Sequence, residues 1–171
     1  VKIVTTCLSI DNMDNQKLKK VLIEYLRKTA GRVREKAADG QGKEILGKVL
    51  NRPEDTEIGI DRVGEEILEK LLKKNGLRAT IFSEMETRNI KNGEDIDFYG
   101  ALDPFDGSAL FSRGFEHNWY SCLSFFDKER KPLSCGVIDI LNDRIYFTDM
   151  KESYDLSDKT GKKKGFFPSK N

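Results

Sequence analysis

Two carboxylates lie three residues apart in the segment ALDPFDGS and could act together on one ion. Pro104 keeps Asp103 extended, because the residue before a proline is disfavoured in the helical region. Asp106-Gly107 is a turn dipeptide that lets the chain reverse. The two carboxylates and the Phe105 carbonyl are therefore directed into one small volume beyond a strand end. These hard oxygen donors suit Mg²⁺, Mn²⁺ or Ca²⁺ and not zinc.

The same residues also form an ordinary turn without a ligand, since Asp-Pro and Asp-Gly are common turn sequences. Two further acids favour the ion. Glu84 follows the short apolar run ATIFS, and Asp61 starts a helical pattern in IGIDRVGEE, where a plain N-cap is the alternative. Acids at the ends of neighbouring strands converge, as ligand-binding groups do at strand ends of open sheets. The sequence therefore predicts a cation site made of Asp61, Glu84, Asp103 and Asp106.

Two helical patterns precede most of these acids. The first runs from Asn15 to about Ala38, with a cap at Asp14-Asn15. The second is DRVGEEILEKLLKKNG, which Asn75-Gly76 ends. Between them, GKEILGKVLNRPEDTEIGID has turn signals and no clear period, which favours an irregular connection.

After the second helix the apolar period becomes two, which is typical of strands. ATIFSE and FYGALDP read as short strands, and WYSCLSFFD, SCGVIDIL and RIYFTDM as longer antiparallel ones joined by the turns KERKP and ND. The fold class is thus α+β, with two N-terminal helices packed on a largely antiparallel sheet. Near-continuous apolar strands need cover on both faces. Because the helices cover only one face, we expect an exposed apolar face and a homo-oligomer, or pairing with another chain.

The composition limits the possible functions. The chain has 171 residues, of which 37% are hydrophobic and 35% charged, with a net charge of +1. This balance gives no reason to expect nucleic-acid or membrane partners. Three cysteines without CxxC spacing indicate neither a zinc site nor disulfides, so a reducing cytoplasm is expected. We expect one α+β domain over residues 1–150 and a polar, Lys-rich linker over 151–171.

Three segments in a fixed order carry a family resemblance. IGIDRVGEEIL, IFSEME and LDPFDGSALFSRGF together resemble the inositol monophosphatase-like family of Mg²⁺-dependent, lithium-sensitive sugar phosphatases. That family includes fructose-1,6-bisphosphatases and 3'(2'),5'-bisphosphate nucleotidases. The resemblance implies the first domain of the family's αβαβα sandwich. It also implies a phosphomonoesterase that hydrolyses inositol monophosphate or fructose 1,6-bisphosphate, with a bisphosphate nucleotide as an alternative substrate.

The resemblance also implies a role for each acid of the predicted cation site. Glu84, Asp103 and the Phe105 carbonyl would hold one Mg²⁺, and Asp103 and Asp106 would share a second. The complete enzyme would use two or three ions, for which Mn²⁺ or Ca²⁺ could substitute in binding.

The remaining implied roles concern the substrate and water. The backbone N–H groups of Gly107 and Ser108 would receive the substrate phosphate, in keeping with the free amides at the start of a helical segment. Asp61 would pair with Ser108 to position and deprotonate the attacking water.

Two departures from the family pattern affect this expectation. Met85 stands where the family has a second acid, and Glu86 follows it. The family's third metal-ligating aspartate lies in a W-D-x-A-A-G motif, but the single tryptophan, Trp119, lies in HNWYSC. We therefore expect the chain to be the N-terminal half of such an enzyme, inactive alone without a C-terminal α/β domain. The alternative is an inert metal-binding or regulatory module of the same fold.

Overall fold

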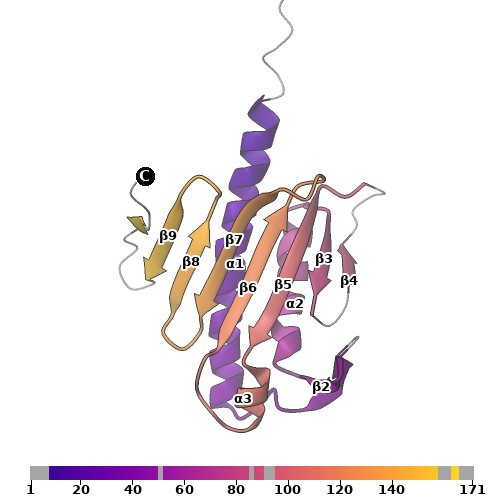
Figure 1. Cartoon of the computed structure of the whole chain (residues 1–171), viewed down its shortest axis with the longest axis vertical. Helices are drawn as coiled ribbons and strands as arrows, with labels where there is room; N and C mark the ends of the chain where they lie inside the picture. The colour runs from indigo at the N-terminus through magenta and orange to yellow at the C-terminus, as the bar shows by residue number, and fades with distance from the viewer. Residues whose placement is uncertain (1–7, 50–51, 85–86, 91–94, 158–162, 166–171) are drawn as a thin grey trace, which may run out of the picture.

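Two long helices lie behind a sheet in the computed structural model, which describes residues 8–49, 52–84, 87–90, 95–157 and 163–165 (Figure 1). Helix α1 spans Leu8–Ala38, α2 spans Asp61–Lys74, and the short α3 spans Ser108–Ser112. Within these ranges no helix has the length and apolar character that crossing a membrane requires.

The main sheet has the strand order β10-β9-β8-β7-β6-β5-β3-β4 in the described part of the chain. Its strands are β3 (Ala79–Ser83), β4 (Thr87–Ile90), β5 (Phe98–Asp106), β6 (Tyr120–Phe126), β7 (Pro132–Asp139), β8 (Arg144–Thr148), β9 (Ser153–Ser157) and β10 (Lys163–Gly165). β3 and β5 are parallel, and the other described pairs are antiparallel. The α+β class and the two predicted hairpins, β6–β7 and β7–β8, are confirmed.

The segment between the two long helices differs from the sequence expectation. It forms an antiparallel hairpin of β1 (Ile45–Val49) and β2 (Arg52–Ile58), separate from the main sheet. Pro53 argued against a strand in the sequence pattern. A two-stranded ribbon nevertheless has edge positions where a proline removes no needed hydrogen bond. The Gly59 N–H donates to the Glu44 carbonyl at 2.9 Å and so closes the base of the hairpin just before α2.

Helix α1 also begins earlier than the sequence indicates. The expected cap at Asp14-Asn15 lies inside the helix, which starts at Leu8. Asp and Asn are common caps, but they are also tolerated at helix interiors, so their presence did not mark the boundary.

The sheet continues past Met150, where the sequence pattern favoured a linker. In β9, Leu156 pairs with Ile145, and Tyr154 stacks on Phe147 with ring centroids 4.6 Å apart. Lys19 of α1 lies over both rings, at 5.0 and 4.8 Å from their centroids. These contacts make β9 part of the packed sheet. The rest of the expected linker, residues 158–162 and 166–171, lies outside the described ranges apart from β10.

Both long helices cover the same face of the sheet. α1 contacts β6 and β7, and α2 contacts β5. The approach of α1 is close, because a Cβ added to Gly136 would lie 2.9 Å from Leu26 and 3.3 Å from Leu22. The core therefore lies between the helices and the rear face of the sheet, with Tyr25, Leu123 and Phe125 among its side chains that are 0% exposed.

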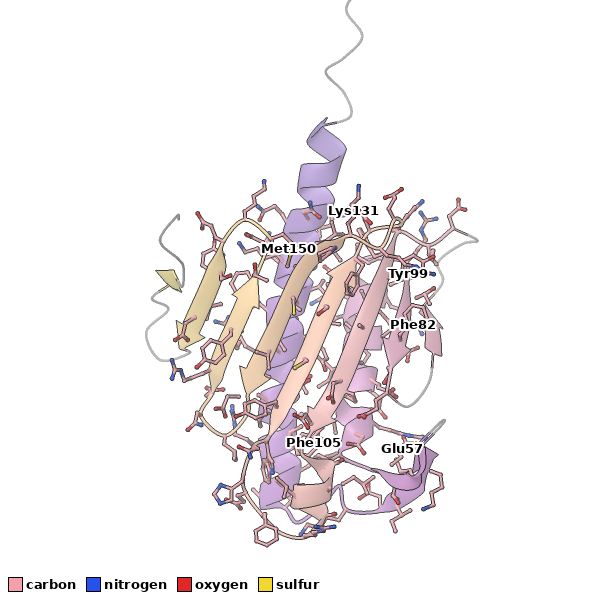
Figure 2. The ribbon with its side chains drawn as sticks, in the orientation of Figure 1. Glu57, Phe82, Tyr99, Phe105, Lys131 and Met150 are labelled. Carbon is pink, nitrogen blue, oxygen red and sulfur yellow. The ribbon has the colours of Figure 1, made fainter. Side chains whose placement is uncertain are left out.

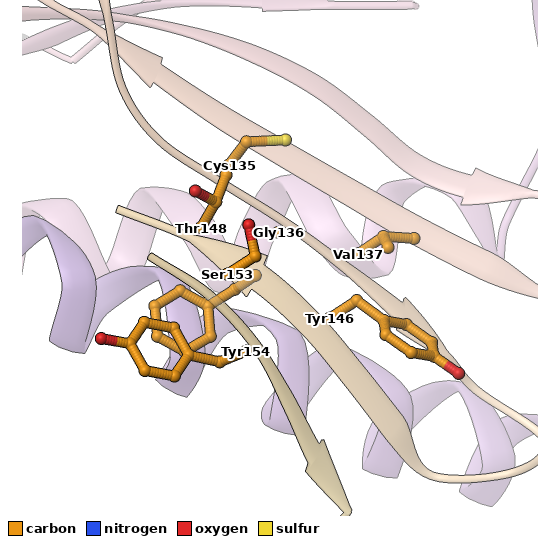
Figure 3. A pocket seen from close by; sticks show the side chains of 8 residues that line it. Cys135, Gly136, Val137, Tyr146, Thr148, Ser153 and Tyr154 are labelled. Atoms are coloured by element: carbon orange, nitrogen blue, oxygen red, sulfur yellow. The ribbon is translucent and has the colours of Figure 1, made fainter. Parts of the chain in front are cut away.

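The front face of the sheet carries no helix in the described ranges, and it has an apolar hollow of about 350 Å³ across β7, β8 and β9 (Figure 3). The strand register places Val137 beside Tyr146, Cys135 beside Thr148, and Thr148 beside Ser153. All five residues line this hollow. The expected absence of a helical cover on one face thus holds for the described residues.

We expect the isolated chain to self-associate through this front face. Val137→Lys should shift the protein towards monomer, because it puts a charge at the side of the hollow. Sedimentation velocity over a range of concentrations measures this. Leu141→Lys is the matched control, since Leu141 is 36% exposed in the turn between β7 and β8. A wild-type chain that stays monomeric at high concentration contradicts the expectation.

Candidate metal-binding site

The predicted site residues gather at one end of the sheet, at the bottom of Figure 1. Because β3 and β5 are parallel and Ser83 pairs with Leu102, Glu84, which follows β3, and Asp103, which lies within β5, are at the same end of the sheet. The start of α2, the β1–β2 hairpin and α3 lie at this end as well (Figure 1). The expected convergence of the two strand ends is therefore present.

Asp61 is a strongly perturbed acid at this end. It is 5% exposed, and its carboxylate accepts a hydrogen bond from the Ile58 N–H at 2.9 Å. Burial raises the pKa of Asp61 to about 7, and repulsion from Glu57, Asp103 and Glu65 adds to the effect. Asp103 is thus within electrostatic range of Asp61, and the shared cation site stays a prediction.

Glu57 and Glu65 were missed by the sequence analysis. They are 9% and 2% exposed, although charged side chains are seldom buried. Glu57 accepts a hydrogen bond from Arg62 Nε at 2.7 Å. Glu65 lies one turn after Asp61 on α2 and so shares its face. The sequence contained a signal for Glu65, because Asp61 and Glu65 lie on the same helical stripe as Leu68.

An aromatic cluster holds the turn that follows Asp103. The rings of Phe105, Phe111 and Trp119 meet edge to face, with centroids 5.7, 5.8 and 5.4 Å apart. Figure 2 shows Phe105 at the same end of the sheet as Glu57, whereas Phe82 lies farther along the strands. The cluster joins β5 to α3 and to the start of β6. Trp119 thus has a packing role here.

Gly107 makes the reversal between β5 and α3 possible. Its φ is +114°, and a Cβ at this position would lie 2.7 Å from the Asn118 carbonyl oxygen. Its own carbonyl accepts hydrogen bonds from the N–H groups of Leu110 at 3.0 Å and Phe111 at 2.9 Å. The expected helical segment after the turn is confirmed as α3, and Ser108 is its first residue.

The other predicted residues take more open positions. Asp106 is exposed at the last residue of β5, and Glu84 is exposed just after β3. Within the described ranges, the Asp61 carboxylate is hydrogen bonded to Ile58 and not to Ser108. The pairing of Asp61 with Ser108 therefore stays a prediction.

The donor set fits Mg²⁺ in its chemistry. Its side chains supply carboxylate oxygens, the ligands that hard divalent cations prefer, and a cation would relieve the repulsion on the buried Asp61. In the described part of the chain, no three His, Cys, Asp or Glu side chains are already grouped so as to hold a metal ion. Of the four predicted acids, Asp61 accepts a hydrogen bond from Ile58, and Glu84 and Asp106 are exposed residues.

Comparisons with known proteins place this geometry in a known fold. No family model and no curated protein matches the sequence. Solved structures do match. The extragenic suppressor protein SuhB of Bartonella henselae has a TM-score of 0.64 at 19% identity, over 83% of this chain and 52% of its own.

Two further structures have the same fold. Inositol monophosphatase II of Staphylococcus aureus has a TM-score of 0.63 at 15% identity, over 90% of this chain and 51% of its own. The fructose-1,6-bisphosphatase of Leishmania major has a TM-score of 0.61 at 14% identity, over 86% of this chain and 53% of its own. The chain thus has the fold of inositol monophosphatase-like structures and spans about half the length of each.

Gly107→Ala should destabilise the fold more than Gly114→Ala. Both glycines have positive φ, at +114° and +83°, but a Cβ at Gly114 meets nothing within 4 Å. The backbone strain common to both is about 1–2 kcal/mol, and the clash with Asn118 adds about 1–3 kcal/mol for Gly107→Ala alone. Urea unfolding of the two variants measures the difference. Equal losses would show that the turn has room for a side chain.

Asp61→Asn should stabilise the metal-free protein more at pH 8 than at pH 5. The raised pKa of about 7 means that the folded state binds more protons than the unfolded state between about pH 4 and 7. Wild-type stability therefore falls as the pH rises through this interval, and the amide escapes this loss. We expect about 2–3 kcal/mol between the two pH values, measured by urea unfolding with a chelator. A pH-independent difference would contradict the burial of an ionised Asp61.

Proposed function

We propose that this chain is the metal-binding part of a Mg²⁺-dependent phosphomonoesterase that acts on a sugar or inositol phosphate. The convergence of Asp61 and Asp103 at the shared end of β3 and β5 carries this proposal. The fold supports it, because the solved structures that share it include an inositol monophosphatase and a fructose-1,6-bisphosphatase.

The carboxylates of this chain would hold the ions. Glu84, Asp103 and the Phe105 carbonyl would hold one Mg²⁺, and Asp103 together with the exposed Asp106 would hold a second. When bound, the ions lower the pKa of water and neutralise charge on the phosphoryl oxygens. The aromatic packing of Phe105 keeps the turn rigid, so that both acids start from a defined backbone.

Asp61 and Ser108 would handle the proton and the substrate. Asp61 is buried at the start of α2, and its carboxylate would accept the proton of the attacking water as a general base. Ser108 orients the attacking water, and the N–H groups of Gly107 and Ser108 at the start of α3 face the substrate phosphate.

Substrate choice stays open between inositol monophosphate and fructose 1,6-bisphosphate, with a 3'(2'),5'-bisphosphate nucleotide as a further option. The chain spans about half of each matched structure. We therefore propose that the activity belongs to a longer assembly and that these residues alone release no phosphate. Neither nucleic acid nor a membrane is part of the proposed function.

An inert metal-binding or regulatory module is the second candidate. It is favoured by one observation: Met85 stands where the family that the sequence resembles has a second acid. Phosphate release with Mg²⁺, measured with and without the remaining half of a related enzyme, separates the two. Turnover on addition of that half would exclude the inert module, and Mg²⁺ binding without turnover would favour it.

Asp103→Asn and Asp106→Asn should abolish Mn²⁺ binding with little loss of fold. The amide can still form the turn, and Asp106 is exposed, so we expect a change in unfolding free energy below about 1 kcal/mol for Asp106→Asn. Mn²⁺ electron paramagnetic resonance measures the affinity. Glu129→Gln is the control, since Glu129 is exposed in the β6–β7 turn. Undiminished Mn²⁺ binding by both aspartate variants would refute the site.

A further inference from the structure

A chain of buried hydroxyl groups reaches from α1 to the backbone of Asp103. The Tyr25 hydroxyl lies 2.8 Å from Ser121 Oγ, and Ser121 Oγ donates to the Asp103 carbonyl at 3.2 Å. Tyr25 and Ser121 are both 0% exposed. Three elements that are distant in sequence, α1, β6 and β5, thus meet at one carbonyl oxygen.

The direction of this hydrogen-bond chain follows from its chemistry. A serine hydroxyl has a single proton, and Ser121 gives it to the Asp103 carbonyl. Tyr25 must therefore be the donor to Ser121. Burial raises the pKa of the Tyr25 hydroxyl, so it keeps its proton at all physiological pH values.

The hydroxyl chain acts where the sheet ladder is interrupted. The β5–β6 register is regular up to Asp103, which pairs with Cys122, and then shifts before Asp106. Pro104 has no N–H to continue the ladder. The Ser121 hydroxyl therefore donates to the Asp103 carbonyl where the ladder is interrupted. This hydrogen bond fixes the backbone of the residue that carries the Asp103 carboxylate.

The same hydroxyl also determines how close α2 can come. A Cβ added to Gly64 would lie 2.7 Å from the Tyr25 hydroxyl and 2.8 Å from Pro104 Cβ. The first turn of α2, which carries Asp61, is thus packed directly on the Asp-Pro unit. Tyr25 therefore lies against the first turn of α2, which carries Asp61, and reaches the Asp103 carbonyl through Ser121.

We propose that Tyr25 and Ser121 are positioning residues that hold Asp103 in the orientation needed for cation binding. This inference rests on the proposed function, because it assigns Asp103 to the ion. Neither residue touches the ion or the substrate, and both act through the Asp103 carbonyl. Removal of groups that orient metal ligands typically weakens metal binding by about 10–100-fold.

The test uses Tyr25→Phe and Ser121→Ala, which remove only the hydroxyl groups. Both should weaken Mn²⁺ binding about tenfold, and the double variant should be little worse than either single one because the hydroxyls form one chain. Ser121→Thr should keep near wild-type affinity, since it retains a hydroxyl. Mn²⁺ electron paramagnetic resonance gives the affinities, and circular dichroism confirms that each variant is folded.

Ser124→Ala is the matched control. Ser124 lies on the same strand, on the opposite face, and its hydroxyl donates to Cys135 Sγ at 3.0 Å. Its removal should leave the Mn²⁺ affinity within about twofold of wild type. The carbonyl ¹³C shift of Asp103 in metal-free protein should change in Tyr25→Phe and Ser121→Ala and not in Ser124→Ala.

Two results would overturn the inference in different ways. Wild-type Mn²⁺ affinity in folded Tyr25→Phe and Ser121→Ala would remove the positioning role and leave the proposed function intact. No Mn²⁺ binding by the wild type, with the carbonyl shifts as expected, would overturn the proposed function and with it the assigned role, although the hydroxyl chain itself would stand.

Discussion

The burial of Asp61 beside other carboxylates is the constraint on which the site depends. A charged carboxylate out of water costs free energy, and Asp103, Glu57 and Glu65 add repulsion. The Ile58 N–H offsets only part of this cost. A fold keeps such a strained cluster where function needs it, because stability alone would favour apolar residues in the same positions. A bound cation would lower the electrostatic repulsion among these carboxylates.

The helical layer makes this arrangement possible. α1 and α2 pack on the rear face of the sheet, and α2 enters it with its first turn against Pro104, where Gly64 leaves room for the Tyr25 hydroxyl. The acids are thus buried from behind, while Glu84 and Asp106 stay open at the edge of the sheet. One side of the candidate site is packed against the helices, and the other is exposed.

The front of the sheet is the face through which we expect this chain to associate. The hollow beside Val137 and Tyr146 is apolar and has no helix over it in the described ranges. The matched structures are about twice as long as the aligned part of this chain. Since the fold at this level of identity says nothing about substrate, the chemistry rests on the carboxylates.

Local patterns in the sequence determined the period-two strands, helix α2, the turn at Asp106-Gly107 and the type of ligand that hard oxygen donors suit. They could not reveal the β1–β2 hairpin, which Pro53 obscures, or strands β9 and β10, whose packing partners are distant in sequence. The tertiary structure alone decided which acids share a buried volume. Proximity through space depends on the parallel pairing of β3 with β5 and on the close approach of α2, and neither is written in local spacing. The same reason explains why Glu57, Glu65 and the link from Tyr25 to Asp103 emerged only from the folded chain.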